Sequence, residues 1–230
     1  MAVLNDIIKL DNYEDMDIFD VIVKLEKSFG LKFEKDAFYH VKTFGDLCDV
    51  FENHITFEHL EDCTKQQAFY RVRNAIVMTQ NIDSSKIKLD TKLADLFPSR
   101  NRIEKTKQFK SYLRTDIDIL TYPGWVATTF FIGLLSSLVV FFISWKIALA
   151  GIAFFIIFIK IARIFGKDLD IRTVRELTEK LSRENYIDIR RTSNTVNRKE
   201  ILQTIIDSFN HDLGIDKIYL TREEKFSWSL

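Results

Sequence analysis

Two neighbouring apolar stretches decide the fold of this chain: GWVATTFFIGLLSSLVVFFIS at residues 124–144 and IALAGIAFFIIFIKIARIF at residues 147–165. They contain 21 and 19 residues, and a helix needs about 20 residues to cross the hydrocarbon core of a bilayer. A hairpin buried inside a soluble protein would need a larger core than the remaining residues provide, because both stretches are apolar on all sides. The sequence therefore predicts a two-helix transmembrane hairpin over residues 123–166.

The charged residues on either side predict the orientation of this hairpin. Lysines and arginines precede the first stretch and follow the second, whereas the turn between them offers only Lys146. Such residues are enriched in cytoplasmic flanks, so we expect two spans in a bacterial inner membrane with both termini in the cytoplasm. Four residues are expected at the membrane interface, namely Trp125, Trp145, Lys160 and Arg163.

The 33 basic and 33 acidic side chains among 230 residues are separated along the chain. Residues 1–65 hold 7 Lys and 15 Asp+Glu, a net charge of −8, and the remainder therefore carries +8. A neutral total argues against a nucleic-acid partner, because nucleic-acid-binding domains usually have a basic excess. The acidic head and the basic remainder could attract each other, the basic part could lie close to anionic lipid, or both could be solvated surfaces.

The sequence has none of the common motifs of catalysis or metal binding. It contains no G-x-S-x-G, glycine-rich phosphate loop or H-E-x-x-H. His54, His59 and Cys63 lack the spacing of a zinc site. Cys48 lies on the apolar side of a predicted helix, as a small buried residue does. We therefore predict a protein that is not an enzyme and has no catalytic residue, metal or cofactor.

Outside the hairpin, apolar residues recur at helical spacing and predict an all-α fold. In the acidic head, Asp15 or Asp17 is expected to cap the start of one helix, which ends at Gly30, and Thr43 is expected to cap the next. Similar amphipathic patterns occupy residues 68–81, 103–113, 173–181 and 197–209.

The run EDMDIFDVIVKLEKSFGLKF at residues 14–33, followed by KTFGDLCDVF at 42–51, resembles the second and fourth helices of acyl carrier proteins. In that family the second helix begins Asp-Ser-Leu, and the serine bears phosphopantetheine. Asp15 stands at the serine position here, and a carboxylate cannot accept that phosphoester. The resemblance implies a carrier-like bundle without the prosthetic group. It also implies an acidic face for a protein partner, which we assign to Glu14, Asp15, Asp17 and Asp20; a solvated face is the alternative.

The rest of the chain supplies two further carrier-like parts. Residues 197–230 resemble a carrier's first helix and its long loop, so we expect residues 195–230 to complete the bundle of residues 1–62, within one chain or by exchange between two chains. Residues 65–121 and 168–192 resemble a second degenerate unit, into which the hairpin is inserted. In this unit Arg100 takes the serine position, and Ser99 is a loop serine.

These features predict a non-enzymatic, membrane-anchored, carrier-like protein that binds a protein partner at the cytoplasmic face. Small residues in the hairpin could also support a homodimer: Gly133, Ser136, Ser137, Ala148 and Gly151. Two other functions fit the same sequence. One is an immunity protein that neutralises a membrane-acting or secreted toxin, and the other is an accessory subunit of a lipid or acyl-chain enzyme.

Overall fold

The computed structural model describes residues 9–34, 36–141 and 144–229, and for residues 163–165 the backbone alone. The prediction of an all-α fold is confirmed over this part of the chain, since helices predominate and each strand has only two residues. The chain forms two compact units. Unit 1 comprises Met1–Arg71 and Thr178–Leu230, and unit 2 comprises Val72–Leu177.

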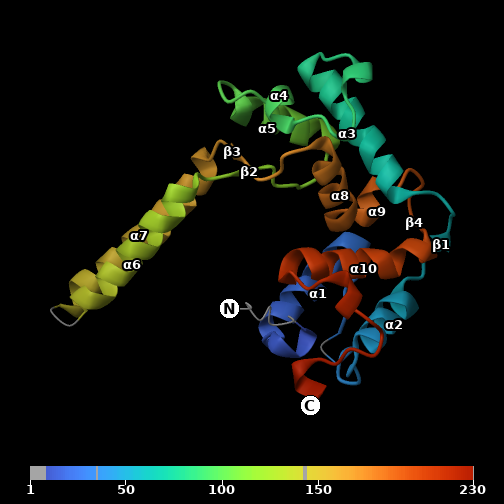
Figure 1. The fold of residues 1–230 in the computed structure, drawn as a ribbon, viewed down its shortest axis with the longest axis horizontal. Helices are drawn as coiled ribbons and strands as arrows, with labels where there is room; N and C mark the ends of the chain where they lie inside the picture. Colours follow the sequence, from blue (N-terminus) through green and yellow to red (C-terminus); the bar gives the residue numbers. More distant parts are fainter. Residues whose placement is uncertain (1–8, 35, 142–143, 230) are drawn as a thin grey trace, which may run out of the picture. The chain divides into compact units, whose positions relative to one another are not determined.

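Unit 1 is built from both ends of the chain (Figure 1). Its elements are α1 (Asp15–Phe29), α2 (Phe44–His54), the start of α3 (Thr64–Gln80), the end of α8 (Val174–Glu184), α9 (Tyr186–Ile189), α10 (Arg198–Leu213), the parallel strands β1 (Glu58–His59) and β4 (Thr195–Val196), and the 3-10 turns η1 (Leu10–Asn12), η3 (Lys217–Tyr219) and η4 (Ser227–Ser229). Helix α1 contacts α9 and α10, and α10 contacts α2. One apolar core contains side chains from residues 10–57 and from residues 186–228. The acidic head and the C-terminal segment therefore fold together as one body.

Residues 178–192 cluster with unit 1, although the sequence placed them in the second carrier-like unit. The Ser28 hydroxyl donates a hydrogen bond to the Arg183 carbonyl oxygen, and the Tyr186 ring lies 5.1 Å from that of Phe29. These contacts bury α9 and the end of α8 against α1. The spacing of apolar residues along one helix does not specify which neighbour covers it, so this contact could not be predicted from the sequence.

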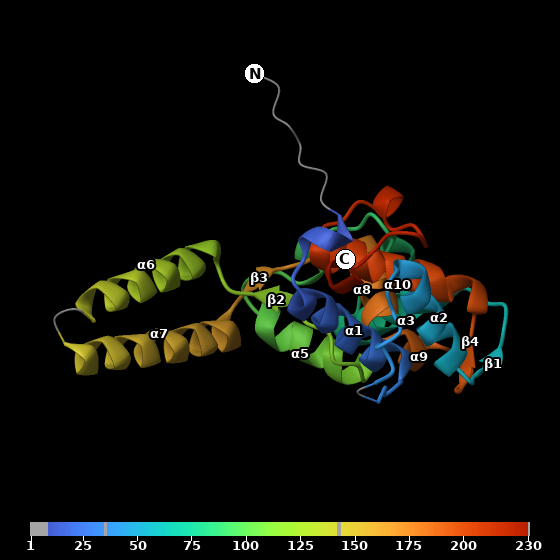
Figure 2. The same cartoon turned by 90° about the horizontal axis from the view of Figure 1, so that it is seen from below.

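Unit 2 contains the apolar helices α6 (Gly124–Val140) and α7 (Trp145–Phe165), which lie side by side (Figure 2). Its other elements are the remainder of α3 and α8, η2 (Ser84–Lys86), α4 (Leu93–Leu96), α5 (Arg102–Leu113), β2 (Leu120–Thr121) and β3 (Asp168–Leu169). Strand β2 precedes α6 in the chain, and β3 follows α7. The two strands pair antiparallel, with Leu120 opposite Leu169. Both ends of the segment that contains α6 and α7 therefore meet at one place.

Small residues pack α6 against α7. A Cβ atom on Gly133 would overlap the Phe155 ring, and one on Gly151 would lie 2.5 Å from the Ser137 hydroxyl oxygen. Ala148 is also buried. Of the small residues that the sequence analysis considers for a homodimer, Gly133, Ser137 and Gly151 make a contact within the chain. Ser136 of the same set is exposed.

The two units share one scheme of local structure. In unit 1, α10 ends at Gly214, which has a φ of 71°, and Asp216 caps η3 by accepting a hydrogen bond from the Ile218 N–H. In unit 2, α3 is followed by Asn81, which has a φ of 54°, and Asp83 caps η2 in the same way. A left-handed residue at both places turns the chain out of its helix and into the same 3-10 turn.

The loops that follow these turns are held by matching backbone contacts. In unit 1 the loop bonds to the start of α2, and in unit 2 the equivalent loop bonds to the start of α8. The contacts of unit 1 join Thr43 with Lys225, Phe44 with Glu224, Gly45 with Arg222, and Phe226 with Lys42. Those of unit 2 join Thr173 with Lys92, Val174 with Thr91, Arg175 with Leu89, and Leu93 with Arg172. The matched positions keep a constant offset in residue number, so the two units repeat one backbone arrangement.

Helix α5 stands in unit 2 where α1 stands in unit 1. Each ends in a residue with positive φ, Gly30 at 63° and Arg114 at 56°. The buried positions before these residues keep the same spacing: Ile22, Leu25 and Phe29 in α1, and Thr106, Phe109 and Leu113 in α5. The short link from α1 to α2 is replaced in unit 2 by a longer segment that carries α6 and α7.

Candidate functional site

The acidic docking face predicted by the sequence lies on the exposed side of α1. The apolar positions of this helix, among them Ile18, Val21 and Leu25, are buried in the core of unit 1. Helical periodicity therefore turns the residues between them outward. All four predicted docking residues are exposed and lie together at the start of the helix: Glu14, Asp15, Asp17 and Asp20.

Apolar side chains lie among these carboxylates. Met16 is 73% exposed and Val23 is 58% exposed, and Phe19 shares the same side of α1. The Phe19 ring stacks on Trp228 at a centroid distance of 5.9 Å, and Trp228 stacks on Phe226 at 4.4 Å. The face therefore combines negative charge with apolar area, and it is continued by the C-terminal turn. The sequence pattern of the acidic residues gave no sign of this aromatic extension.

Asp15 has a contact within the chain. The Ser227 hydroxyl donates a hydrogen bond of 2.8 Å to an Asp15 carboxylate oxygen. Asp15 and Asp17 also lie in the first turn of α1, where negative charge is favoured by the helix dipole. Asp15 therefore helps to hold η4 against α1, which leaves Glu14, Asp17 and Asp20 as the stronger candidates for an outside partner.

The surroundings of Tyr13, just before α1, shift the pKa of its phenol. Partial burial, followed by the charge of Asp17, raises the pKa of the Tyr13 phenol above its usual value. Its hydroxyl donates a hydrogen bond to the Leu213 carbonyl oxygen. Tyr13 is thus a neutral donor that ties the entry of α1 to the end of α10.

The predicted interface residues lie at both ends of the apolar helices. Trp125 is in the first turn of α6 and Lys160 is near the end of α7, and both are exposed. Trp145 begins α7 and is exposed, with the Lys146 ammonium 5.9 Å from its ring centre. The side chain of Arg163 lies outside the described residues.

A buried arginine that the sequence did not single out holds the long loops of unit 1. Arg190 donates hydrogen bonds to the carbonyl oxygens of Leu60 and Asp62 and to the hydroxyl oxygens of Thr64 and Thr195, and it forms an ion pair with the Asp62 carboxylate. A buried guanidinium whose hydrogen bonds all go to its own chain has a structural role. It fixes the loop before α3 against the segment that leads to β4.

Cys48 is buried in the core of unit 1, as the sequence predicted. Burial raises the pKa of the Cys48 thiol to about 12. The thiol is therefore protonated at neutral pH, and a thiolate nucleophile is disfavoured at this position. Cys63 is exposed.

Comparison of the chain with protein families, curated proteins and solved structures gave no match.

Proposed function

We propose that α6 and α7 cross a bacterial inner membrane as a two-span hairpin, with both termini in the cytoplasm. The remainder is a non-enzymatic, carrier-like protein that binds a protein partner through the acidic face of α1.

The exposure of the apolar side chains on α6 and α7 carries this proposal. The residues Trp145–Ala162 have a mean hydropathy of 2.1, and only 6% of them are buried. Large apolar side chains are exposed along both helices, including Phe131, Ile132, Leu135, Leu138, Val139, Ile147, Leu149, Phe154, Ile156, Ile157 and Ile161. Soluble proteins rarely expose a continuous apolar surface of this size, and a core helix would be mostly buried. A bilayer provides the missing apolar surroundings.

The lengths of the helices are compatible with a bilayer. At about 1.5 Å per residue, the 21 residues of α7 extend about 31 Å, which matches a hydrocarbon core of about 30 Å. By length and composition, α7 is the one helix in the described part of the chain that is suited to span a membrane alone. Helix α6 has 17 residues, at the short end of the usual range. Its close packing on α7 supports insertion of the two helices together.

The pairing of β2 with β3 supports a hairpin with both flanks on one side. Trp125 and Lys160 lie toward this paired end, whereas Trp145 and Lys146 lie at the opposite end. This arrangement places an aromatic residue and a lysine toward each expected interface.

Thiol labelling tests this topology. Lys146→Cys in a Cys63→Ser background places a reporter at the turn, while Cys63 in the natural chain reports on unit 1. A membrane-impermeant maleimide applied outside the inner membrane should label Lys146→Cys in intact spheroplasts, and it should label Cys63 only after lysis. Labelling of Cys63 from outside, or release of the protein by alkaline carbonate, would contradict the proposal.

The exposed acidic and apolar residues of α1 support a role in protein binding. Charge guides the approach of a basic partner, and apolar side chains supply area that can be removed from water. The resemblance to carrier proteins, which dock through the corresponding helix, points to the same face.

Charge reversal tests the face directly. Asp17→Lys with Asp20→Lys should reduce recovery of a copurifying protein from detergent extracts. Glu34→Lys with Glu223→Lys makes the same change of charge at other exposed sites of unit 1 and should not. Equal recovery with both pairs of variants would remove α1 as the docking face.

A further inference from the structure

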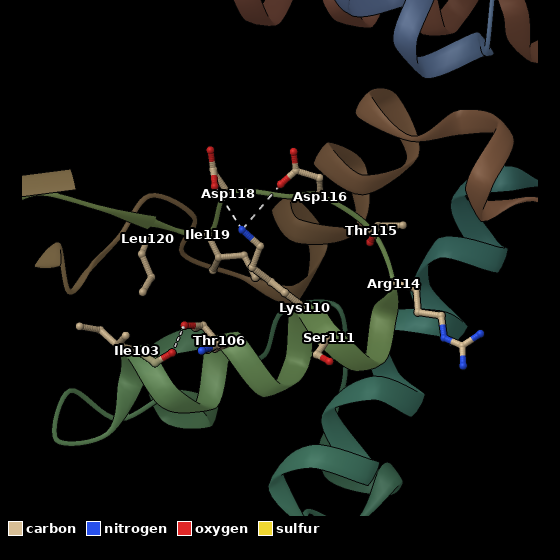
Figure 3. A pocket seen from close by; sticks show the side chains of 11 residues that line it. Ile103, Thr106, Lys110, Ser111, Arg114, Thr115, Asp116, Asp118, Ile119 and Leu120 are labelled. Atoms are coloured by element: carbon tan, nitrogen blue, oxygen red, sulfur yellow. Dashed lines mark hydrogen bonds and ion pairs between the residues drawn. The ribbon is translucent and has the colours of Figure 1, made fainter. Parts of the chain in front are cut away.

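A groove in unit 2 lies between α5 and the extended segment that follows it (Figure 3). Its volume is about 660 Å³, within the range of about 300–1,000 Å³ that is typical of small-molecule sites. The sequence predicts a helix over residues 103–113 but no site there.

Basic and hydroxyl groups line one part of the groove. Lys107 and Lys110 lie three residues apart, so both face the groove from α5. Lys110 reaches toward the facing segment, where its ammonium lies 3.3 Å from an Asp118 oxygen and 3.9 Å from an Asp116 oxygen (Figure 3). The two carboxylates are largely exposed, and exposed ion pairs of this kind are weak. An anion that enters the groove can therefore compete for Lys110.

Thr115 contributes a buried hydroxyl with unmet hydrogen-bonding capacity at the edge of the groove. It lines the groove and is only 8% exposed, yet its hydroxyl oxygen is buried without a hydrogen-bond partner among the described residues. A buried hydroxyl without a partner is unfavourable. Lysine ammonium groups beside a hydroxyl donor suit the oxygens of a phosphate group.

The other part of the groove is apolar and includes residues that precede α6 in the chain. Ile103, Ile119 and Leu120 line it, and Leu120 belongs to β2, which pairs with β3 beneath α6 and α7. If these helices span the bilayer, as proposed above, a groove beside β2 lies at the level of the lipid headgroups. A phosphate with an attached apolar chain fits both parts of the groove.

The matched positions of unit 1 lack this basic character. Val23 and Glu26 stand in α1 where Lys107 and Lys110 stand in α5. The Glu26 carboxylate accepts a hydrogen bond of 2.7 Å from the Phe33 N–H, and the Phe33 ring packs 4.9 Å from Phe51. In unit 1 the Glu26 carboxylate is thus engaged within the chain, and Val23 offers no charge. The two lysines occur only in the unit that carries the apolar helices.

We propose that this groove binds the phosphate of a phospholipid headgroup. Lys107 and Lys110 balance its charge, and the apolar part of the groove receives the first carbons of the lipid chains. The Thr115 hydroxyl, whose oxygen is shielded from solvent, turns toward the phosphate and donates a hydrogen bond to it. This inference rests on the proposed membrane location for the source of the phosphate.

Binding to the full chain, purified in a neutral detergent, tests the proposal. The probes are short-chain phosphatidylglycerol, glycerol phosphate and short-chain diacylglycerol, measured by native mass spectrometry. Phosphatidylglycerol should bind best. Lys107→Gln with Lys110→Gln should weaken it roughly thirty-fold, because each cation near a lipid surface contributes about a factor of five. Lys105→Gln, outside the groove on the same helix, should leave binding unchanged.

The acidic residues provide a variant with the opposite sign. Asp116→Asn with Asp118→Asn should tighten phosphatidylglycerol binding, because it frees Lys110; a merely disrupted groove would bind less. If diacylglycerol binds as tightly as phosphatidylglycerol, or if the lysine variants do not change phosphatidylglycerol binding, the phosphate assignment is overturned. Equal binding of glycerol phosphate would overturn the lipid source. Carbonate extraction tests the membrane location independently. A protein that stays in the membrane but fails these binding tests refutes the lipid-binding groove and leaves the membrane location standing.

Discussion

The replacement Gly30→Ala should open unit 1 more often, because Gly30 ends α1 with a φ of 63°. A residue with a Cβ atom pays about 1 kcal/mol in this left-handed conformation. The nearest atom to a Cβ built at Gly30 is Ile187 Cγ1 at 4.0 Å, so no steric clash adds to that cost. The expected loss of stability is therefore about 1 kcal/mol, or roughly a fivefold increase in the open population.

Cys48 provides the assay. Its side chain is fully buried and its thiol is protonated at neutral pH, so reaction with a thiol reagent requires opening of unit 1. In a Cys63→Ser background of the detergent-solubilised chain, Gly30→Ala should speed the labelling of Cys48 about fivefold when closing is faster than reaction. Gly124→Ala is the matched control, because a Cβ atom there meets nothing within 4 Å and the residue lacks a positive φ. An unchanged rate for Gly30→Ala, or an equal acceleration by Gly124→Ala, would refute the reasoning.

Three further predictions follow from other contacts. Gly133→Leu should overpack the contact between α6 and α7 and cost about 1–3 kcal/mol in thermal unfolding, whereas Ser136→Leu, which is exposed on α6, should cost far less. Arg190→Met should cost about 1–3 kcal/mol, because it removes the hydrogen-bond donor to the buried hydroxyl oxygens of Thr64 and Thr195. The loss should be seen as fast Cys48 labelling that the exposed Arg191→Met does not produce. The backbone N–H groups at the start of α2 lower the pKa of Asp46, so its contribution is present at neutral pH and is lost as the pH falls through that lowered pKa. Asp46→Asn should therefore lower the unfolding temperature at pH about 7 more than at pH about 2.

Much of the fold could be predicted from local patterns. Helices α1 and α2 begin and end close to the residues that the sequence marked, because Gly30 supplies a left-handed end and Thr43 a capping hydroxyl. Helix α6 was harder, since the structure ends it at Val140 rather than at residue 144, and residues 142–143 lie outside the described residues. Apolar composition gives the presence of a helix but marks its end poorly when no cap residue follows.

Only the acidic part of the candidate docking face could be predicted from the sequence. The carboxylates of α1 could be identified because they occupy the positions between the apolar residues of the helix, such as Ile18 and Val21. The stacking of Phe19 on Trp228 and the bond from Ser227 to Asp15 join residues more than 200 positions apart, and no local pattern encodes such a pairing.

By itself, the sequence determined an all-α chain, two long apolar stretches, and an acidic helix that ends at Gly30, because these depend on periodicity and on residues close in the chain. The expected cap at Asp15 or Asp17 was wrong, since Glu14 is the N-cap residue of α1 and its side chain makes no capping hydrogen bond. The tertiary structure decided which segments share a core, that the turn and loop of one unit are repeated in the other, and that Lys107, Lys110 and Thr115 line one groove. Those features depend on packing and backbone hydrogen bonds between distant segments. The side chains that take part in them have ordinary local surroundings in the sequence, and only folding brings them together.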